Sequence, residues 1–281
     1  MKNELEILQS YFNWIVKNYD ESESENIIVF RGHTRICNTL SPVVLRSADI
    51  DEDEILQKAK YHTCSQLRNC CNDLEKLVLL QHYELKTRLL DFTFNPFVAL
   101  YMACAEEQEK DGEIICLKPR CVAENICQLI ADYLMNYGSK TIDWTIVKNL
   151  AIKHRIQNMD MLLNNLSEPQ FFYPAYNNPR IRVQKGFFLI APLLSKQTQS
   201  YFSLDNKDSI LQIKGNTLHG FNVYDFYPNV KKYTINATQK KDLLKALNLI
   251  GIDESSMFPE FEHLLHTINQ KFPSMIGSCN Y

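Results

Sequence analysis

The run from Pro96 to Ala105, PFVALYMACA, is apolar on almost every side. Asn95-Pro96 at its start is typical of a helix N-terminus, because Asn accepts hydrogen bonds from the free N–H groups of the first turn and proline at the first helical position has no N–H to leave unpaired. A helix that is apolar all round is stable only when it is buried. The rest of the chain therefore has to enclose this helix.

A polar window lies directly before that helix, and ordinary core packing needs none of its polar groups. It contains His82, Lys86, Thr87, Arg88, Asp91 and Thr93. We expect Thr87 to Thr93 to form a short strand or an extended turn that leads into the helix N-terminus, where N–H groups and the helix dipole favour anions. The window is interpreted as the floor of a ligand site, with Asp91 and Thr93 at its lip.

The segment IIVFRGH, from Ile27 to His33, predicts a strand of four apolar residues that stops at Arg31-Gly32-His33. Arginine at the end of a buried strand is costly unless it meets an anion or a carboxylate. Arg31 is therefore a candidate site residue. Gly32 allows a ligand or a neighbouring backbone to come close.

Polar residues return between Arg180 and Gln184, where Arg180, Arg182 and Gln184 alternate with Ile181 and Val183 before GFFLI. This alternation predicts a strand with one polar face, interpreted as the lining of a cleft. The alternative is a solvated edge strand whose charges protect it against aggregation.

The remaining pattern predicts an α+β fold with a small central β-sheet flanked by helices. Helices are expected over Leu5 to Tyr19, over about Ile55 to Leu79, from a cap at Thr238 to Gly251, and in a last helix that carries Phe261, His263 and His266. Strands are expected at Glu113 to Leu117 and within FNVYDFYPNVKKYTI. We expect one domain over 1–281, with a core at about 26–190, a helical insert at about 119–168, and a C-terminal strand and helices at about 205–272.

With 281 residues, 45% of them hydrophobic and 22% charged, the composition is that of a soluble globular protein. The net charge of -3 gives no general case for nucleic acid or a membrane as partner. No stretch approaches the roughly 20 apolar residues that span a bilayer. The N-terminus lacks a signal-peptide pattern, so a cytoplasmic location is expected. The nine cysteines are scattered without a CxxC pair, and we expect free thiols and no metal site.

Three blocks resemble the FRG domain family of bacterial and phage proteins, which is named for its Phe-Arg-Gly motif. They are FRGH at Phe30 to His33, QHYELKTRLLDFTFNPFVALYMA at Gln81 to Ala103, and NPRIRVQKGFFLI at Asn178 to Ile190. MFPEFEHL near the C-terminus is similar to the closing helix of the family. The family usually has Gly and Pro where this chain has Glu84 and Lys86, and Trp in place of Phe92. The resemblance implies a part in a toxin, effector or antiphage defence system, with an antitoxin or another defence component as partner.

A weaker likeness is to ADP-ribosyltransferases. Arg31-Gly32 after an early strand, Asp91-Phe92-Thr93 before the Asn95 helix, and Gln184 stand in the corresponding order, although Gln184 replaces the usual carboxylate. The likeness implies NAD as substrate and an unknown macromolecular acceptor. The catalytic residues would be Arg31, His82, Asp91 and Gln184, and those holding NAD would be Arg31, His33, Thr87, Arg88, Thr93 and Asn95. Since glutamine cannot act as a base, Asp91 or Glu84 is the better candidate for that role.

Two further interpretations stay open. In the first, Arg31 or Arg88 forms a buried ion pair with Asp91, and Gln184 and Asn95 complete a polar network in a binding module without chemistry. In the second, His33, His82 and Asp91 belong to a nuclease or nucleotide hydrolase. Nucleic acid also remains a candidate partner, through the basic strip of Arg180, Arg182 and Lys185.

Overall fold

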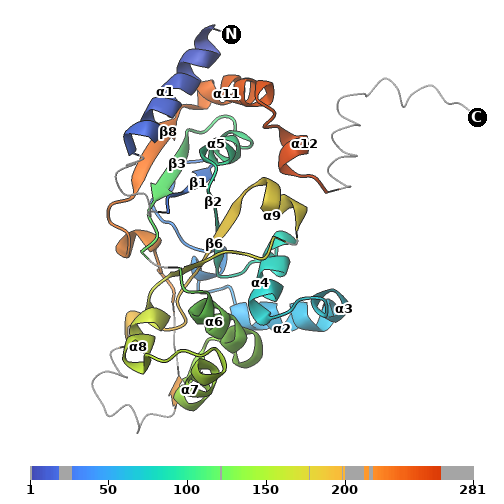
Figure 1. Cartoon of the computed structure of the whole chain (residues 1–281), viewed down its shortest axis with the longest axis vertical. Coiled ribbons are helices and arrows are strands. Elements are labelled where there is room, and N and C mark those ends of the chain that lie inside the picture. Colours follow the sequence, from blue (N-terminus) through green and yellow to red (C-terminus); the bar gives the residue numbers. More distant parts are fainter. Residues whose placement is uncertain are drawn as a thin grey trace, which may run out of the picture.

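A computed structural model describes residues 2–18, 27–120, 122–176, 178–197, 199, 212–214 and 218–260. Its centre is a six-stranded sheet with the order β5-β6-β2-β1-β3-β8, in which all pairs are antiparallel. The strands are β1 (Val29–His33), β2 (Leu89–Thr93), β3 (Gly112–Leu117), β5 (Gln170–Phe172), β6 (Gly186–Ile190) and β8 (Lys231–Ile235). Helices flank the sheet (Figure 1), which confirms the predicted α+β class.

The two central strands, β1 and β2, are joined at a single register pair, Phe30 with Thr93. By contrast, β1 pairs with β3 along its whole length, and β2 pairs likewise with β6. We call the place where β1 and β2 separate beyond Phe30 and Thr93 the seam. It divides the sheet into a β5-β6-β2 half and a β1-β3-β8 half.

Two groups of helices pack on one face of the sheet (Figure 1). The first group covers the β1-β3-β8 half and consists of α1 (Lys2–Asn18), α5 (Pro96–Cys104) and α11 (Ala237–Leu249). The second group packs against β2, β5 and β6 and consists of α2 (Glu52–His62), α4 (Asp73–His82), α6 (Glu124–Tyr137), α7 (Trp144–Lys153) and α8 (Met159–Ser167). The opposite face is covered by irregular chain with two short 3₁₀ turns, η1 (Val43–Leu45) and η2 (Val223–Asp225).

Helix α5 is buried, as its composition requires. Asn95 caps it by accepting from the N–H of Phe97 at 3.0 Å, and Pro96 is its first residue. A Cβ atom on Gly32 of β1 would lie 2.0 Å from the carbonyl oxygen of Ala99. The glycine therefore lets the backbones of β1 and α5 touch, which is the close approach that the sequence allowed.

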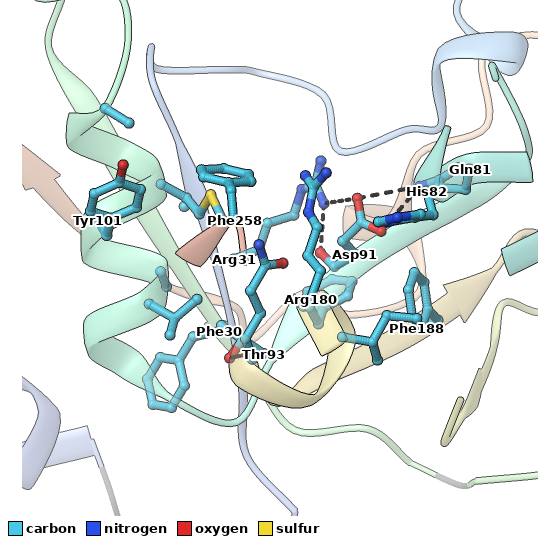
Figure 2. A pocket seen from close by; sticks show the side chains of 18 of the residues that line it. Phe30, Arg31, Gln81, His82, Asp91, Thr93, Tyr101, Arg180, Phe188 and Phe258 are labelled. Atoms are coloured by element: carbon cyan, nitrogen blue, oxygen red, sulfur yellow. Dashed lines mark hydrogen bonds and ion pairs between the residues drawn. The ribbon is translucent and has the colours of Figure 1, made fainter. Parts of the chain in front are cut away.

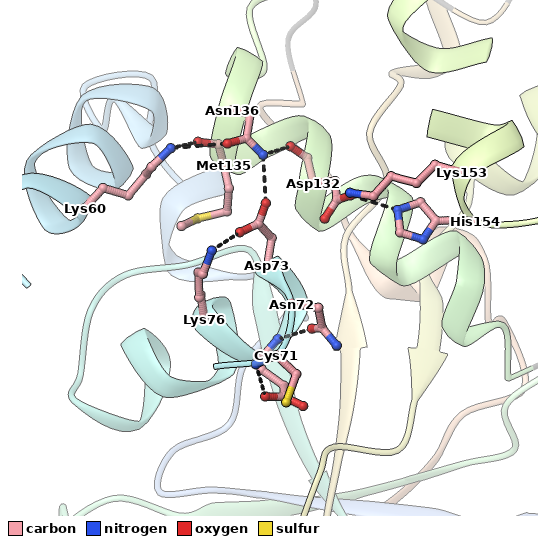
Figure 3. Close-up of polar contacts among 11 residues, drawn as sticks. Lys60, Cys71, Asn72, Asp73, Lys76, Asp132, Met135, Asn136, Lys153 and His154 are labelled. Carbon is pink, nitrogen blue, oxygen red and sulfur yellow. Dashed lines mark hydrogen bonds and ion pairs between the residues drawn. The ribbon is translucent and has the colours of Figure 1, made fainter. Parts of the chain in front are cut away.

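Polar contacts tie α4 to the other helices of its group (Figure 3). Asn136 of α6 donates to Asp73 at the start of α4 at 2.7 Å. Asp132, one turn earlier on α6, accepts from Lys153 of α7 at 2.5 Å and lies 2.8 Å from His154. The bond from Asn136 fixes the start of α4 against α6, and the contacts of Asp132 fix α6 against α7. The last residues of α4 reach the centre of the sheet.

The predicted helical insert contains α6, α7 and α8 and also a short strand, β4 (Thr141–Asp143), which pairs with β7 (Gln212–Lys214). Within the described ranges no helix combines the length and apolarity needed to cross a bilayer. The expected last helix with His263 and His266 lies outside the described residues, and so does most of its flanking chain.

Three local predictions were wrong. The expected long helix over Ile55 to Leu79 is split into α2, α3 (Cys64–Leu67) and α4, because the side chain of Asn72 accepts from the N–H of Glu75 and starts a new helix. Helix α11 is capped by Asn236 rather than Thr238. The segment Arg180 to Gln184 is no strand: Pro179–Val183 is a short helix, α9, capped by Asn178, and the strand begins only at Gly186.

Candidate functional site

A cavity of about 590 Å³ lies between the two helix groups, on the face of the sheet that they share. Its floor is formed by Phe30, Asp91, Thr93 and Phe188 of the sheet, and its walls come from α4, α5, α9 and the segment after α12 (Glu254–Met257). Four predicted catalytic residues, Arg31, His82, Asp91 and Gln184, all line it. Figure 2 labels the first three of them. The structure therefore brings together residues that lie up to 153 positions apart in sequence.

Arg31 reaches the cavity through the seam. Alternation along β1 places Arg31 with Val29 and His33 on the face covered by irregular chain. Its Nη1 nevertheless donates to the backbone carbonyl of Asp91 at 2.5 Å and lies 3.8 Å from the Asp91 carboxylate. The guanidinium thus replaces a ladder hydrogen bond that the separated strands no longer make. Burial lowers the pKa of Arg31, and the carboxylate of Asp91 opposes this shift.

His33 supports Arg31 from behind and does not line the cavity. Its Nε2 accepts from Nε of Arg31 at 3.0 Å, and its Nδ1 lies 3.3 Å from Oε1 of Glu113. Nδ1 therefore carries the proton and donates it to Glu113. Burial lowers the pKa of His33, and the hydrogen bond to Glu113 opposes this shift.

Glu113 belongs to a group that has the composition of a metal site. Ligand atoms of His33, Cys37 and Glu113 all lie within 4.8 Å of one another. However, Glu113 accepts from the Cys37 N–H at 2.9 Å and pairs with Lys232 at 3.3 Å, and Nδ1 of His33 is already protonated. A protonated ring nitrogen cannot bind a metal ion, so this group is arranged to hold Arg31 rather than a cation.

Asp91 stands at the mouth of the cavity with 57% of its side chain exposed. The side-chain amide of Gln81 donates to both of its carboxylate oxygens at 3.2 Å, and Gln81 in turn accepts from the hydroxyl of Thr87. Thr87 is buried and does not line the cavity, so it acts on the site through Gln81. The amide of Gln81 holds the carboxylate in place without neutralising its charge.

Helix α9 contributes Arg180, which the sequence indicated as part of a cleft-lining polar face and of a basic strip but not as a catalytic or NAD-binding residue. Its guanidinium lies 4.7 Å from the centre of the Phe258 ring, a cation–π contact, and it lines the cavity with Arg31 (Figure 2). The neighbouring Arg182 is exposed and donates to the carbonyl of Tyr176 instead. Asn178-Pro179, which repeats the Asn95-Pro96 pattern, was the signal that this segment is helical.

Gln184 lines the cavity from the C-terminal end of α9, but its amide is engaged. The side-chain amide donates to the backbone carbonyl of Met257 at 3.0 Å. The backbone carbonyl of Gln184 accepts from the hydroxyl of Thr93 at 2.6 Å. These bonds join the end of α9 to β2 and to the last residue of α12. The contacts fit a structural bridge better than a catalytic carboxylate substitute.

His82 at the end of α4 has only 10% of its side chain exposed and lines two cavities. The second cavity, of about 320 Å³, shares Val78, His82 and Ile181 with the first. Nε2 of His82 lies 3.5 Å from Oε1 of Glu260. Burial lowers the pKa of His82, nearby Arg180 lowers it further, and Glu260 raises it.

Besides His33 and Thr87, two further predicted ligand-binding residues do not line the cavity. Arg88 is 1% exposed and forms a buried ion pair with Glu52, with a further bond to the carbonyl of Pro192 at 2.7 Å. Its carboxylate partner is therefore Glu52 and not Asp91. Asn95 is occupied in capping α5.

The turn that departs from the FRG pattern shows why glycine is usual there. Glu84 has a φ of 63°, in the left-handed region that favours glycine. Phe92 is 3% exposed and packs edge-on against Phe171, so an aromatic ring remains where the family usually has Trp. Glu84 lines the cavity near His82.

Comparison with known proteins gives one match. Residues 26–112 match the family model of the FRG domain, so an FRG domain is present in this chain. No curated protein and no solved structure matches the chain. The matched segment contains Arg31, His82 and Asp91, whereas Arg180, Gln184 and Phe258 lie beyond it.

Proposed function

We propose that this FRG-domain protein binds NAD in the cavity between its helix groups and transfers the ADP-ribosyl moiety to a macromolecular acceptor. The observation that carries the proposal is the convergence of Arg31, Arg180, His82 and Asp91 on one cavity. A cavity of about 590 Å³ is within the range of roughly 300–1,000 Å³ typical of small-molecule sites.

Charge in the cavity supports an anionic ligand. Arg31 and Arg180 both line it, and the guanidinium of Arg180 has a ring rather than a carboxylate as its described partner. Guanidinium groups bind phosphate oxygens through charge-assisted, often bidentate, hydrogen bonds. A pyrophosphate between these two arginines would satisfy both.

The apolar walls support a ligand that also carries flat rings. Phe30, Phe188, Tyr101 and Phe258 line the same cavity, and aromatic walls with a few converging polar groups are typical of nucleotide-sized ligand sites. A dinucleotide combines a doubly charged centre with two heterocycles. Its chemistry therefore matches both the charged and the apolar parts of the cavity.

The exposed carboxylate of Asp91 supports a reaction at the glycosidic bond. Breaking that bond passes through an oxocarbenium-like state, which a nearby negative group stabilises. Asp91 is held at the cavity mouth by Gln81 with its charge intact. We assign this electrostatic role to Asp91 and the anchoring of the pyrophosphate to Arg31 and Arg180.

By its FRG domain we further propose that the protein acts in a toxin, effector or antiphage defence system within the cytoplasm. A non-catalytic binding module is the second candidate, since Arg31 already satisfies the carbonyl of Asp91 and is itself held by His33. In that case the cavity would bind its ligand without turning it over.

The test is calorimetric titration with NAD, together with nicotinamide release in the presence of cell lysate as the source of acceptor. Arg180→Ala should weaken NAD binding about 10- to 100-fold, because it removes a charge-assisted contact. Arg182→Ala is the matched control on the same helix and should bind as the wild type does. Asp91→Asn should still bind NAD but lose nicotinamide release.

The outcomes separate the two candidates. Binding with no release of nicotinamide by any variant favours the non-catalytic module. Absence of NAD binding by wild-type protein that unfolds cooperatively on heating would rule out the nucleotide site altogether.

A further inference from the structure

Glu260 carries a carboxylate in an unusual situation. Both of its oxygens are shielded from solvent, and neither has a hydrogen-bond partner within the described part of the chain. A buried carboxylate is costly unless a cation or a donor compensates it. The nearest ionisable partner is Nε2 of His82, 3.5 Å from Oε1.

We propose that His82 is the general base of the site and that Glu260 is the residue that positions it. The inference rests on the proposed ADP-ribosyl transfer and names the group that activates the acceptor. Asp91 retains the electrostatic role assigned above.

The position of Glu260 beside Nε2 favours one tautomer of His82. When Nε2–H points at the Glu260 carboxylate, Nδ1 is left without a proton and can accept one. Because His82 lines both cavities, its ring can be reached by a ligand in the first cavity and by a group entering from the second. A general base that activates the acceptor has to contact both the bound NAD and the acceptor group.

The step balances without a further reactant. The acceptor X–H gives its proton to Nδ1 of His82, and the electron pair on X forms the bond to the ribose C1′. The bond from C1′ to the nicotinamide nitrogen breaks, its electrons stay on nitrogen, and nicotinamide leaves as a neutral molecule. The proton then passes from His82 to solvent. The imidazolium that forms in between is stabilised by the negative charge of Glu260.

The ionisable groups around His82 decide the pH at which it works. Besides Arg180, Glu260 and the adjacent Tyr83 ring, they are the ionisable residues that line the two cavities: Arg31, Glu84, Asp91, Tyr101, Glu106 and Glu254 at the first, and Cys70, Glu75, Glu124 and Tyr173 at the second. Burial and Arg180 lower the pKa of His82, which favours the neutral ring that can accept a proton. The rate should therefore rise with pH through the pKa of His82 and then level off.

The experiment compares wild type, His82→Gln, Glu260→Gln and Glu109→Gln. Glu109 is an exposed residue between α5 and β3, so its variant removes one carboxylate away from the site. The pKa of His82 is measured in the full chain by NMR titration of histidine ring protons, with His82→Gln assigning the resonance. Nicotinamide release is followed from pH 5 to 9, and thermal unfolding verifies that each variant is folded.

Glu260→Gln should lower the pKa of His82 by about one unit, since it removes an opposite charge. The acid limb of the pH–rate profile should shift to lower pH by the same amount. The plateau rate should fall roughly tenfold, because the imidazolium loses its counter-charge. His82→Gln should lose about 100-fold or more at every pH. Glu109→Gln should match wild type in both measurements.

Two results would overturn the inference, and they have different consequences for the proposed function. If wild type releases nicotinamide while Glu260→Gln leaves both the His82 pKa and the rate profile unchanged, Glu260 does not position His82 and the proposed function stands. If no variant, wild type included, releases nicotinamide, the proposed function fails and the assignment of a base fails with it.

Discussion

The guanidinium of Arg88 is held entirely by protein groups. It meets the Glu52 carboxylate through Nε, with 3.0 Å to each oxygen, and through Nη2, while Nη1 donates to the carbonyl of Pro192. Both side chains are 5% exposed or less. The pair fastens the start of α2 to the start of β2, and so helps to place the second helix group on the sheet.

Removing one partner of this pair should be strongly destabilising. Glu52→Gln leaves Arg88 as an uncompensated buried charge, and we expect the free energy of unfolding to fall by about 3–5 kcal/mol. Urea denaturation at pH 7 measures it. Glu54→Gln on the same helix is the control, because its partner Lys58 is exposed and that ion pair should contribute nothing measurable. Equal losses in the two variants would contradict this account.

For single residues, the sequence predicted partners well where the chemistry of one side chain was sufficient for the inference. A charge on an apolar strand needs a partner, and that reasoning identified Arg31 and Asp91 correctly as neighbours. The same reasoning paired Arg88 with the wrong carboxylate, because Glu52 lies 36 positions away on a helix that no local pattern connects to β2. Glu260 was missed because its partner His82 lies on α4, which is distant in sequence.

Among the elements, α9 has the greatest effect on the site for its length. It spans five residues, and the side chain of Asn178 caps it by accepting from the N–H of Arg180 at 2.8 Å. Ile181 is buried below, while Arg180 and Gln184 turn toward the cavity. A helix this short depends on its cap and on its packing.

Loss of the cap should therefore affect the ligand as well as stability. Asn178→Ala should cost about 1 kcal/mol of unfolding free energy. It should also weaken NAD binding severalfold, because the backbone that carries Arg180 loses its first hydrogen bond. Asn158→Ala is the control, since Asn158 caps α8 in the same way at 3.1 Å and lies outside both cavities. If the two variants weaken NAD binding equally, α9 has no special part in the site.

The wrong prediction for this segment has a physical cause. In RIRVQ the apolar residues alternate, which fits a strand over a window too short to separate the two periods. Helix α5, whose Asn-Pro start is followed by nine apolar residues from Phe97 to Ala105, left no such ambiguity. Asn178-Pro179 correctly indicates a helix start, but the prediction followed the alternating pattern instead.

For the molecule as a whole, the FRG match and the site do not coincide. Residues 26–112 include β1, β2 and α5, but the strands next to them in the sheet are β6 and β3, and only the first residue of β3 falls in the match. The cavity also needs α9 and Phe258. In an isolated 26–112 segment, the apolar side chains of Leu89, Leu90 and Phe92 would lose buried contacts with residues outside the segment.

We expect a fragment of residues 26–112 to lack a cooperative unfolding transition and to bind no NAD. Circular dichroism with thermal melting and calorimetry measure the two properties, with the full chain as the comparison. A cooperative transition in the fragment would mean that the matched segment folds independently of the sheet that surrounds it.

The overall class and the place of the helical segment at residues 119–168 were predictable, because helical and strand periods differ over long windows. The strand order was not, since β2 lies between β1 and β6, and β8 joins the sheet last. Such pairings depend on contacts between distant segments. The division into one domain stays a prediction.

The seam also has a mechanical meaning. A β-sheet carries load between strands through its ladder of hydrogen bonds, and between β1 and β2 much of that load passes through the guanidinium of Arg31. This link is a side chain that an anion can draw away, unlike a backbone rung. A ligand that drew Arg31 away from the Asp91 carbonyl would therefore loosen the link between the two halves of the sheet.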